Sequence, residues 1–348
     1  MKLFSAFLLI TLAAPAVSAQ AQRDASERLV LAVDSNRIRI HLAVLAHDSL
    51  EGRGPGTRGG RKAAEYIAAR FRELHLEPAG DSGSFFHYFT IRDGNDGRSV
   101  SCRNVAGLLR GSGPGADEVV VIGGHYDHLG IGPAVNGDSI YNGAEDNAGG
   151  VAQLLALAEA FVKSGVRPRR SLLFLAFDAE EPGLLGAEAF VRRPTVALDR
   201  QVAMINFDAV NMYGETRDIA ALGLKESTLD GTFRQAARAE HMVVPADQPD
   251  SIEAFFLRSD QLPFARAGIP AVFPFVGWDF VGRTPQWALD QWNQYFAERY
   301  HQPDDEMQPW FRLGGALQQV RVIARMTLDL ASAEDRPRWS HKSRFRRN

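Results

Sequence analysis

Two apolar runs, each ending abruptly in histidines and acids, constrain the fold of this 348-residue chain more than any other feature. Residues 119–122 read VVVI and lead into GGHYDHLG, and residues 172–177 read LLFLAF and lead into DAEEPG. Short apolar runs of this kind are typical of strands buried on both faces. Ligands of open α/β sheets bind beyond the carboxyl ends of the strands, because the loops converge there. We therefore expect the two charged clusters to form walls of one crevice.

Two further strand or loop ends, and the start of a helix, add ligand-type residues to the same crevice. A third strand over residues 202–207 ends in Asp208, and residues 300–305 supply another histidine with acids beside it. Residues 143–147 (GAEDN) open a helix, where an acid is favoured by the helix N-terminus. Histidine and carboxylate together suit zinc, and several acids can hold two ions. A strand that ends in one acid is ordinarily a solvated loop, so the prediction depends on the combination.

These motifs resemble those of the co-catalytic zinc aminopeptidases, a family that includes bacterial leucyl aminopeptidase, glutamate carboxypeptidase II and glutaminyl cyclase. The resemblance covers about residues 41–330 and keeps the order and approximate spacing of the motifs. The motifs are HYDHLG, DSIYNGAEDNAGG, FDAEEPGLLGA, NFD, SDQLPFARAGIPAVF and RYHQPDDE. The resemblance implies an α/β fold of three α/β/α layers with a mixed, mostly parallel central sheet, of the phosphorylase/hydrolase-like zinc-peptidase type.

Carried over to the matching positions, the resemblance implies two zinc ions per chain. Asp146 would bridge both ions, because a bridge needs a carboxylate whereas imidazole offers a metal only one lone pair. The remaining ligands would be His125 and Asp208 in the first site, and Glu181 and His301 in the second.

Two more acids receive catalytic roles from the resemblance. Glu180 matches the general base of the family, and Asp127 matches the acid that fixes the tautomer of a metal-bound histidine. In the implied mechanism, a hydroxide shared by two zinc ions attacks the peptide carbonyl, and Glu180 passes its proton to the leaving amine. The peptide bond after the bridging acid is often cis in the family, which makes Asp146–Asn147 a candidate for that geometry.

The sequence predicts a secreted dizinc aminopeptidase and leaves other activities open. A glutaminyl cyclase on the same scaffold would use the corresponding ligands with one zinc. A carboxypeptidase would read a terminal carboxylate through an arginine such as Arg258 or Arg283. A non-catalytic binding protein is disfavoured, because the base and all five ligands are present. Glu145 and residues 148–150 (AGG) depart from the commonest family form without removing a ligand.

The ends of the chain differ from its centre in composition. Residues 1–19 are expected to be a signal peptide, with Lys2 before an apolar core and VSA as the cleavage site; a buried helix is the alternative. We therefore expect export to a periplasm or to the outside of the cell, and a catalytic domain over residues 20–335. Residues 336–348 are basic and are expected to be a solvated end that need not be ordered.

Partners follow from charge and composition. A net charge of −3 gives no reason to expect a nucleic-acid partner. The sequence after the N-terminal region contains no apolar run long enough to predict stable membrane insertion. Peptide substrates are the expected partners, and the oligomeric state is open. Cys102 is the only cysteine, so no intrachain disulfide can form.

Three other parts of the sequence could have either a structural or a functional role. The glycine-rich residues 51–60 lack a P-loop pattern, so we interpret them as structural. Asp260 would either border the site or cap a helix. The aromatic residues of 275–300 would pack a helix, form a wall of the substrate pocket, or do both.

Overall fold

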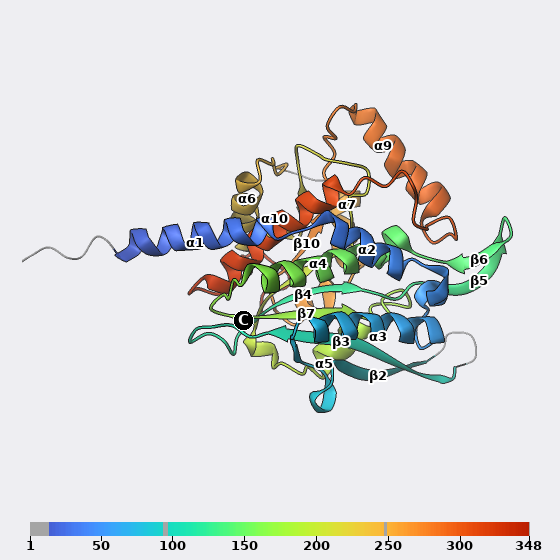
Figure 1. Cartoon of the computed structure of the whole chain (residues 1–348), viewed down its shortest axis with the longest axis horizontal. Coiled ribbons are helices and arrows are strands. Elements are labelled where there is room, and N and C mark those ends of the chain that lie inside the picture. Colours follow the sequence, from blue (N-terminus) through green and yellow to red (C-terminus); the bar gives the residue numbers. More distant parts are fainter. Residues whose placement is uncertain (1–13, 93–96, 247–248, 348) are drawn as a thin grey trace, which may run out of the picture.

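The computed structural model describes residues 14–92, 97–246 and 249–347, and its centre is a mixed eight-stranded sheet (Figure 1). The strand order is β1-β3-β7-β4-β8-β10-β9, with β2 also paired to β3. A separate hairpin, β5–β6, extends from the right of the molecule in Figure 1. The strands are β1 (Glu77–Pro78), β2 (Phe86–Arg92), β3 (Ser99–Leu109), β4 (Val119–His125), β5 (Gly130–Val135), β6 (Asp138–Tyr141), β7 (Ser171–Phe177), β8 (Gln201–Asn206), β9 (Ala220–Leu222) and β10 (Ala271–Phe275).

The centre of the sheet is parallel and its edges are antiparallel. β4 runs parallel to β7 and β8, and β8 runs parallel to β10. β1, β2 and β9 join through antiparallel pairs, as does β3 to β7. The predicted mixed sheet is therefore confirmed, with its parallel pairs confined to the centre. Since His125 pairs with Phe177, and Gly123 with Asn206, the loops after β4, β7 and β8 start side by side.

Helices cover both faces of the sheet, which confirms the predicted three layers. Alternate β4 residues face opposite layers: Val120 and Ile122 pack with α1–α4, α6 and α10, whereas Val119 and Val121 pack with α5 and α8. The helices are α1 (Ala14–Leu31), α2 (Ser35–Leu45), α3 (Arg58–Glu73), α4 (Gly149–Ser164), α5 (Leu185–Arg192), α6 (Leu229–Ala239), α7 (Asp250–Glu253), α8 (Gln261–Arg266), α9 (Pro285–Gln294) and α10 (Gly314–Ser332).

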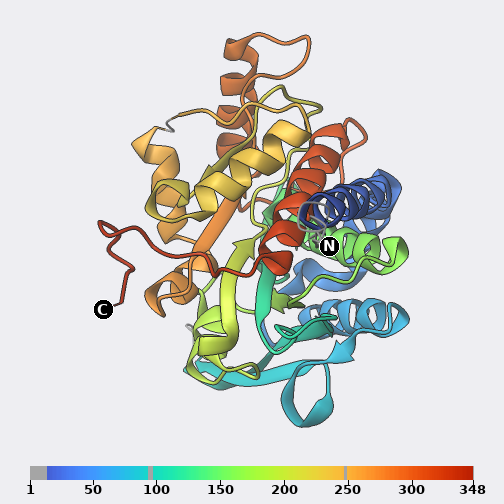
Figure 2. The same cartoon turned by 90° about the vertical axis from the view of Figure 1, so that its left-hand side faces the viewer.

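The C-terminal segment packs on the same face of the sheet as α8. Its basic composition predicts a solvated end, and the structure differs from that prediction. Figure 2 shows this segment, in red, running back from α10 across the molecule. Trp339 and Phe345 are buried in the same core as α8, and the Trp339 indole donates to the Gly268 carbonyl at 3.0 Å. Arg336 pairs with Glu118 at 2.6 Å. Two apolar anchors therefore outweigh the basic composition of the segment.

The expected signal peptide lies mostly outside the described residues. Residues 1–13 are not described, and α1 begins at Ala14. Export therefore stays a prediction. Within the described part of the chain, no helix combines the length and the apolar character that a membrane span needs.

A partly buried ion-pair network joins α2 to α4. Glu159 of α4 accepts from Arg37 at 2.6 and 2.7 Å, and its Oε1 lies 2.9 Å from Nε2 of buried His41. The other nitrogen of His41 lies 2.7 Å from the Tyr66 hydroxyl. Burial by itself raises the pKa of Glu159, but the hydrogen bonds from Arg37 and His41 outweigh it and lower the pKa to about 2.

This network predicts a pH-dependent cost of the substitution Glu159→Gln. Because the folded pKa lies below the ordinary value of 4.5, the carboxylate stabilises the fold above pH 4.5 and loses that effect as the pH falls towards 2. We expect the free energy of unfolding to fall by ~1–3 kcal/mol at pH 7, and by less at pH 3. Urea unfolding at both pH values measures this. Glu73→Gln, on an exposed pair with Arg70, is the control, and an equal loss in both variants would contradict the prediction.

Candidate metal centre

Three neighbouring strands deliver acids and a histidine to one edge of the sheet. His125 is the last residue of β4, Glu180 and Glu181 follow β7, and Asp208 follows β8. Parallel pairing of these strands brings their carboxyl ends together. Asp146 comes from the turn η3 (Ala144–Ala148), at the start of α4.

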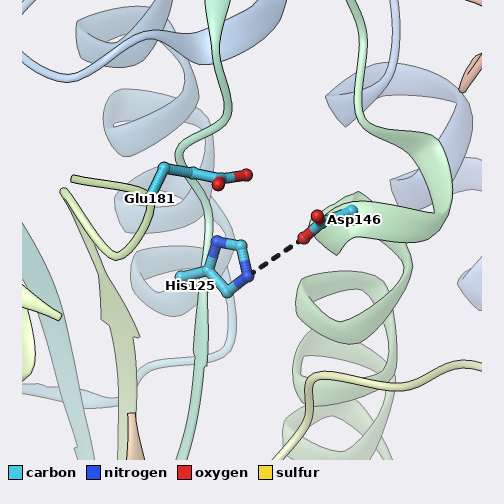
Figure 3. A group of neighbouring side chains, drawn as sticks. All are labelled: His125, Asp146 and Glu181. Carbon is cyan, nitrogen blue, oxygen red and sulfur yellow. Dashed lines mark ion pairs between the residues drawn. The ribbon is translucent and has the colours of Figure 1, made fainter. Parts of the chain in front are cut away.

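The side chains form two groups that share Asp146. In the first group, Nε2 of His125 lies 3.3 Å from Oδ1 of Asp146 and 3.0 Å from Oδ1 of Asp208. In the second group, Nε2 of His301 lies 3.2 Å from Oδ2 of Asp146 and 3.2 Å from Oε2 of Glu181. Figure 3 shows His125, Asp146 and Glu181 pointing toward one another. The two oxygens of Asp146 therefore face two different histidines.

These spacings fit two tetrahedral zinc ions. Two ligand atoms that each lie 2.0–2.1 Å from one tetrahedral ion are about 3.3 Å apart, and the four distances run from 3.0 to 3.3 Å. Nε2 of His301 is buried and has no hydrogen-bond partner among the described residues, although two carboxylates lie beside it. The structure thus brings together all five residues that the sequence predicts as ligands.

His125 is oriented through the loop that follows it. Its Nδ1 lies 3.2 Å from the carbonyl oxygen of Asp127, whereas the Asp127 carboxylate lies 3.7 Å away. A proton on Nδ1 donates to that carbonyl and leaves the Nε2 lone pair for a metal. The Asp127 carboxylate accepts instead from the backbone N–H groups of Glu180 and Glu181, at 3.0 and 3.3 Å. Its contact is therefore with the turn that carries the predicted base.

The turn that carries Asp146 is held by Asp305. The Asp305 carboxylate accepts from the backbone N–H groups of Glu145 at 2.9 Å and of Asp146 at 3.1 Å. Gly143 enters this turn with a positive φ of 54°, and a Cβ there would collide with the Asp146 carbonyl. The Asp146–Asn147 peptide bond is cis, as the resemblance suggested.

Sequence reasoning missed three residues of the centre. The first is His128, whose Nδ1 lies 2.5 Å from Oε1 of Glu181; the HYDHLG motif contained it, but no role was assigned. The second is Asp305, four positions after His301 in the RYHQPDDE motif. The third is Arg53, in the glycine-rich loop, and nothing in the sequence around it pointed to the centre.

The site carries an excess of negative charge. Burial, together with the nearby acids Asp208, Asp260 and Glu181, raises the pKa of Glu180 to about 10, against the lowering effect of His125. Burial lowers the pKa of His301, but Asp146 and Glu181 outweigh it and raise it to about 10. Divalent cations would relieve this repulsion and favour the ionised form of Glu180.

Asp260 borders this cluster and does not cap a helix. It precedes α8, but its side chain makes no capping hydrogen bond. Both carboxylate oxygens are buried without a hydrogen-bond partner among the described residues. Burial and the charge of Asp208 raise the pKa of Asp260 well above its ordinary value, against the effect of His125. The helix-cap interpretation is therefore wrong.

The centre opens into a cavity of about 510 Å³ with an aromatic wall. Seven of the ten Phe, Trp and Tyr residues that line it lie in residues 275–300, the segment that includes α9 and η7 (Tyr295–Arg299), which confirms the pocket-wall interpretation. Tyr300 stacks on His301 with ring centroids 3.9 Å apart. The Phe, Trp and Tyr residues of the lining are Tyr213, Phe255, Phe273, Phe275, Trp278, Phe280, Trp292, Tyr295, Phe296 and Tyr300.

Comparison with known proteins agrees with this centre. The model of the family described as Peptidase family M28 matches residues 104–324. A probable zinc metalloprotease of Pyrenophora tritici-repentis is 34% identical over 157 residues, which are 44% of this chain and 35% of that protein. Aminopeptidase YwaD of Bacillus subtilis is 26% identical over 209 residues, which are 59% of this chain and 40% of that protein. The chain thus spans well under half the length of these relatives.

Solved structures share the fold. The glutaminyl cyclase of Fimbriiglobus ruber superposes with a TM-score of 0.64 and 18% identity, over 85% of this chain and 95% of that chain. At this identity, the likeness shows the α/β fold alone.

The shared carboxylate predicts that Asp146→Ala loses metal from both groups of ligands. Each histidine would keep only one carboxylate of its group, so neither group would hold zinc tightly. Elemental analysis after gel filtration is the measurement, and we expect about two zinc ions in the parent protein and fewer than one in the variant. Glu188→Ala removes an acid at the rim of the cavity and should leave the zinc content unchanged. Two ions in the Asp146 variant would contradict the bridge.

Proposed function

Since the chain belongs to peptidase family M28, we propose that it is an exported dizinc aminopeptidase that removes the N-terminal residues of peptides. The observation that carries this proposal is the sharing of Asp146 by two histidine–carboxylate groups, beside Glu180 and an aromatic cavity. The composition of residues 1–19 supports export.

The five ligands named above would hold the two ions. Zinc bound there would polarise the scissile carbonyl and activate water as the nucleophile. The rest of the chemistry falls to side chains of this chain, and above all to Glu180.

Glu180 is placed to act as the general base. It lines the cavity, and its backbone N–H donates to the Asp127 carboxylate at 3.0 Å, which fixes the turn. It is not one of the five proposed ligands, although one of its carboxylate oxygens lies within 4.8 Å of ligand atoms of His125 and Asp208. We therefore assign its carboxylate to proton transfer from the attacking water. It would then deliver this proton to the leaving amine.

The cavity supports recognition of an apolar N-terminal side chain. Aromatic rings such as Phe255, Trp278 and Trp292 offer a large apolar surface, and burying a bulky side chain there favours binding by about 1.5–3 kcal/mol.

A glutaminyl cyclase is the second candidate, because the Fimbriiglobus ruber enzyme of that name shares the fold and the ligand motifs do not separate the two activities. The sequence relatives favour a peptidase, because the Bacillus subtilis relative that matches 59% of this chain is named an aminopeptidase. A cyclase would release ammonia from an N-terminal glutamine, and a peptidase would release the glutamine itself.

Replacing the proposed base predicts a specific kinetic defect. Glu180→Gln keeps the size of the side chain but cannot accept a proton, so we expect kcat to fall by roughly 10²–10⁴-fold. The zinc content should stay that of the parent, since no shared ligand is removed. Glu73→Gln, on an exposed pair with Arg70 outside the cavity lining, is the control and should keep its activity. A Glu180 variant with parental kcat would refute the mechanism.

The activity itself is tested by mass spectrometry of two peptides, Gln-Leu-Phe and Phe-Leu-Ala, incubated with zinc-loaded protein with and without a chelator. We expect chelator-sensitive release of the first residue, most rapidly from Phe-Leu-Ala because of the aromatic cavity. Loss of ammonia alone from Gln-Leu-Phe would identify a cyclase instead. Release of the C-terminal residue would identify a carboxypeptidase, and two unchanged peptides would overturn the proposal.

A further inference from the structure

Arg53 is a fully buried arginine behind the metal centre. It ends the turn η1 (Asp48–Arg53) and is 1% exposed. The four hydrogen bonds of its guanidinium all end on backbone carbonyl oxygens. These belong to Leu45 and Tyr126, both at 2.6 Å, to Gly143 at 2.8 Å and to Asn142.

The carbonyls that Arg53 binds belong to two segments that carry predicted metal ligands. Tyr126 directly follows His125, and Gly143 lies three residues before Asp146. One guanidinium therefore connects the loop that follows His125 to the turn that carries Asp146. An arginine can do this because its planar fork offers five donors in fixed directions.

Asp305 holds the turn that carries Asp146 by accepting hydrogen bonds from the backbone N–H groups of that turn. Its carboxylate accepts from the backbone of Glu145 and Asp146, and its own carbonyl accepts from Ala144 at 2.9 Å. The Arg53 guanidinium thus binds the carbonyls of residues 142–143, and the Asp305 carboxylate binds the N–H groups of residues 145–146. Since Asp305 lies four positions after His301, this clamp also fixes the second histidine loop.

Charge explains why a buried guanidinium is tolerated here. Burial lowers the pKa of Arg53 to about 10, and the nearby acids Asp305, Asp127, Asp146 and Glu181 oppose that shift. Arg53 therefore remains a cation at neutral pH. A buried cation is costly unless its hydrogen bonds are satisfied and opposite charge is near, and both conditions hold.

We propose that Arg53 is a positioning residue of the metal centre, which sets Asp146 relative to His125 through the carbonyls of their two loops. The inference rests on the proposed metal centre and is independent of the substrate. Metal affinity then depends on the fork of the guanidinium, because a lysine would keep the charge but donate from one nitrogen and reach fewer carbonyls.

The test compares Arg53→Lys with Arg170→Lys. Arg170 is another fully buried arginine that donates to backbone carbonyls, those of Leu330 at 2.8 Å and Ala333 at 2.7 Å among them. It directly precedes β7, whereas Glu180 follows the far end of that strand, roughly 20 Å away. The zinc dissociation constant of each metal-free protein is measured by competition with a chromophoric chelator, and thermal unfolding is followed in parallel.

We expect both variants to unfold at lower temperature, and only Arg53→Lys to bind zinc more weakly, by about 10–100-fold. Equal zinc affinities in the two variants, or a parental affinity in Arg53→Lys, would overturn the inference. If Arg53→Lys does not fold, Asp305→Asn loosens the same turn from its other side. Weaker zinc binding by folded Asp305→Asn supports the clamp, and parental binding overturns it.

The zinc readout separates this inference from the proposed function. Parental protein that binds zinc but cleaves neither peptide would overturn the peptidase proposal and leave the Arg53 comparison valid. Parental protein that binds no zinc would overturn the metal centre and this inference together.

Discussion

The structure of the site depends on one carboxylate that faces two histidines. Asp146 offers Oδ1 to His125 and Oδ2 to His301, at 3.3 and 3.2 Å. A carboxylate can do this only if its backbone is fixed, because a small rotation would move both oxygens at once. The chain meets that requirement at a point where regular structure is absent, in the turn before α4. Side chains from distant parts of the sequence, rather than a helix or a strand, hold this turn.

Electrostatics and packing work together around this carboxylate. Burial and the neighbouring acids together raise the pKa of Glu180, so the metal-free arrangement carries a cost that cations would relieve. The surrounding fold bears this cost through a rigid sheet whose central strands are buried on both faces. Figure 1 shows α9 projecting from the upper right of the molecule, and residues of α9 line the cavity of the centre. A rigid acidic floor and an aromatic wall are thereby combined in one site.

Much of the fold and of the centre could be predicted because their signals are local. Strands β4, β7 and β8 are short apolar runs, and a histidine or an acid stands at the end of each or within two residues after it. The basic C-terminal segment shows where such reasoning fails: its charge predicts a solvated end, yet Trp339 and Phe345 are buried. Two apolar residues among many arginines give no periodic pattern, so their burial depends on a surface that only the folded sheet provides. Asp260 was ambiguous for the same reason, since its position before α8 is that of a cap, but its carboxylate is buried and makes no capping hydrogen bond.

The sequence by itself determined the ligand types, their order along the chain and the α/β class, because a metal ligand must be a particular residue and a buried strand must be apolar. The tertiary structure decided which residues hold those ligands in place. Arg53 and Asp305 act on backbone carbonyl and N–H groups, which every residue carries, so their partners leave no mark in the sequence. Only the path of the folded chain brings a guanidinium from η1 and a carboxylate from beyond η7 to the two sides of the same turn.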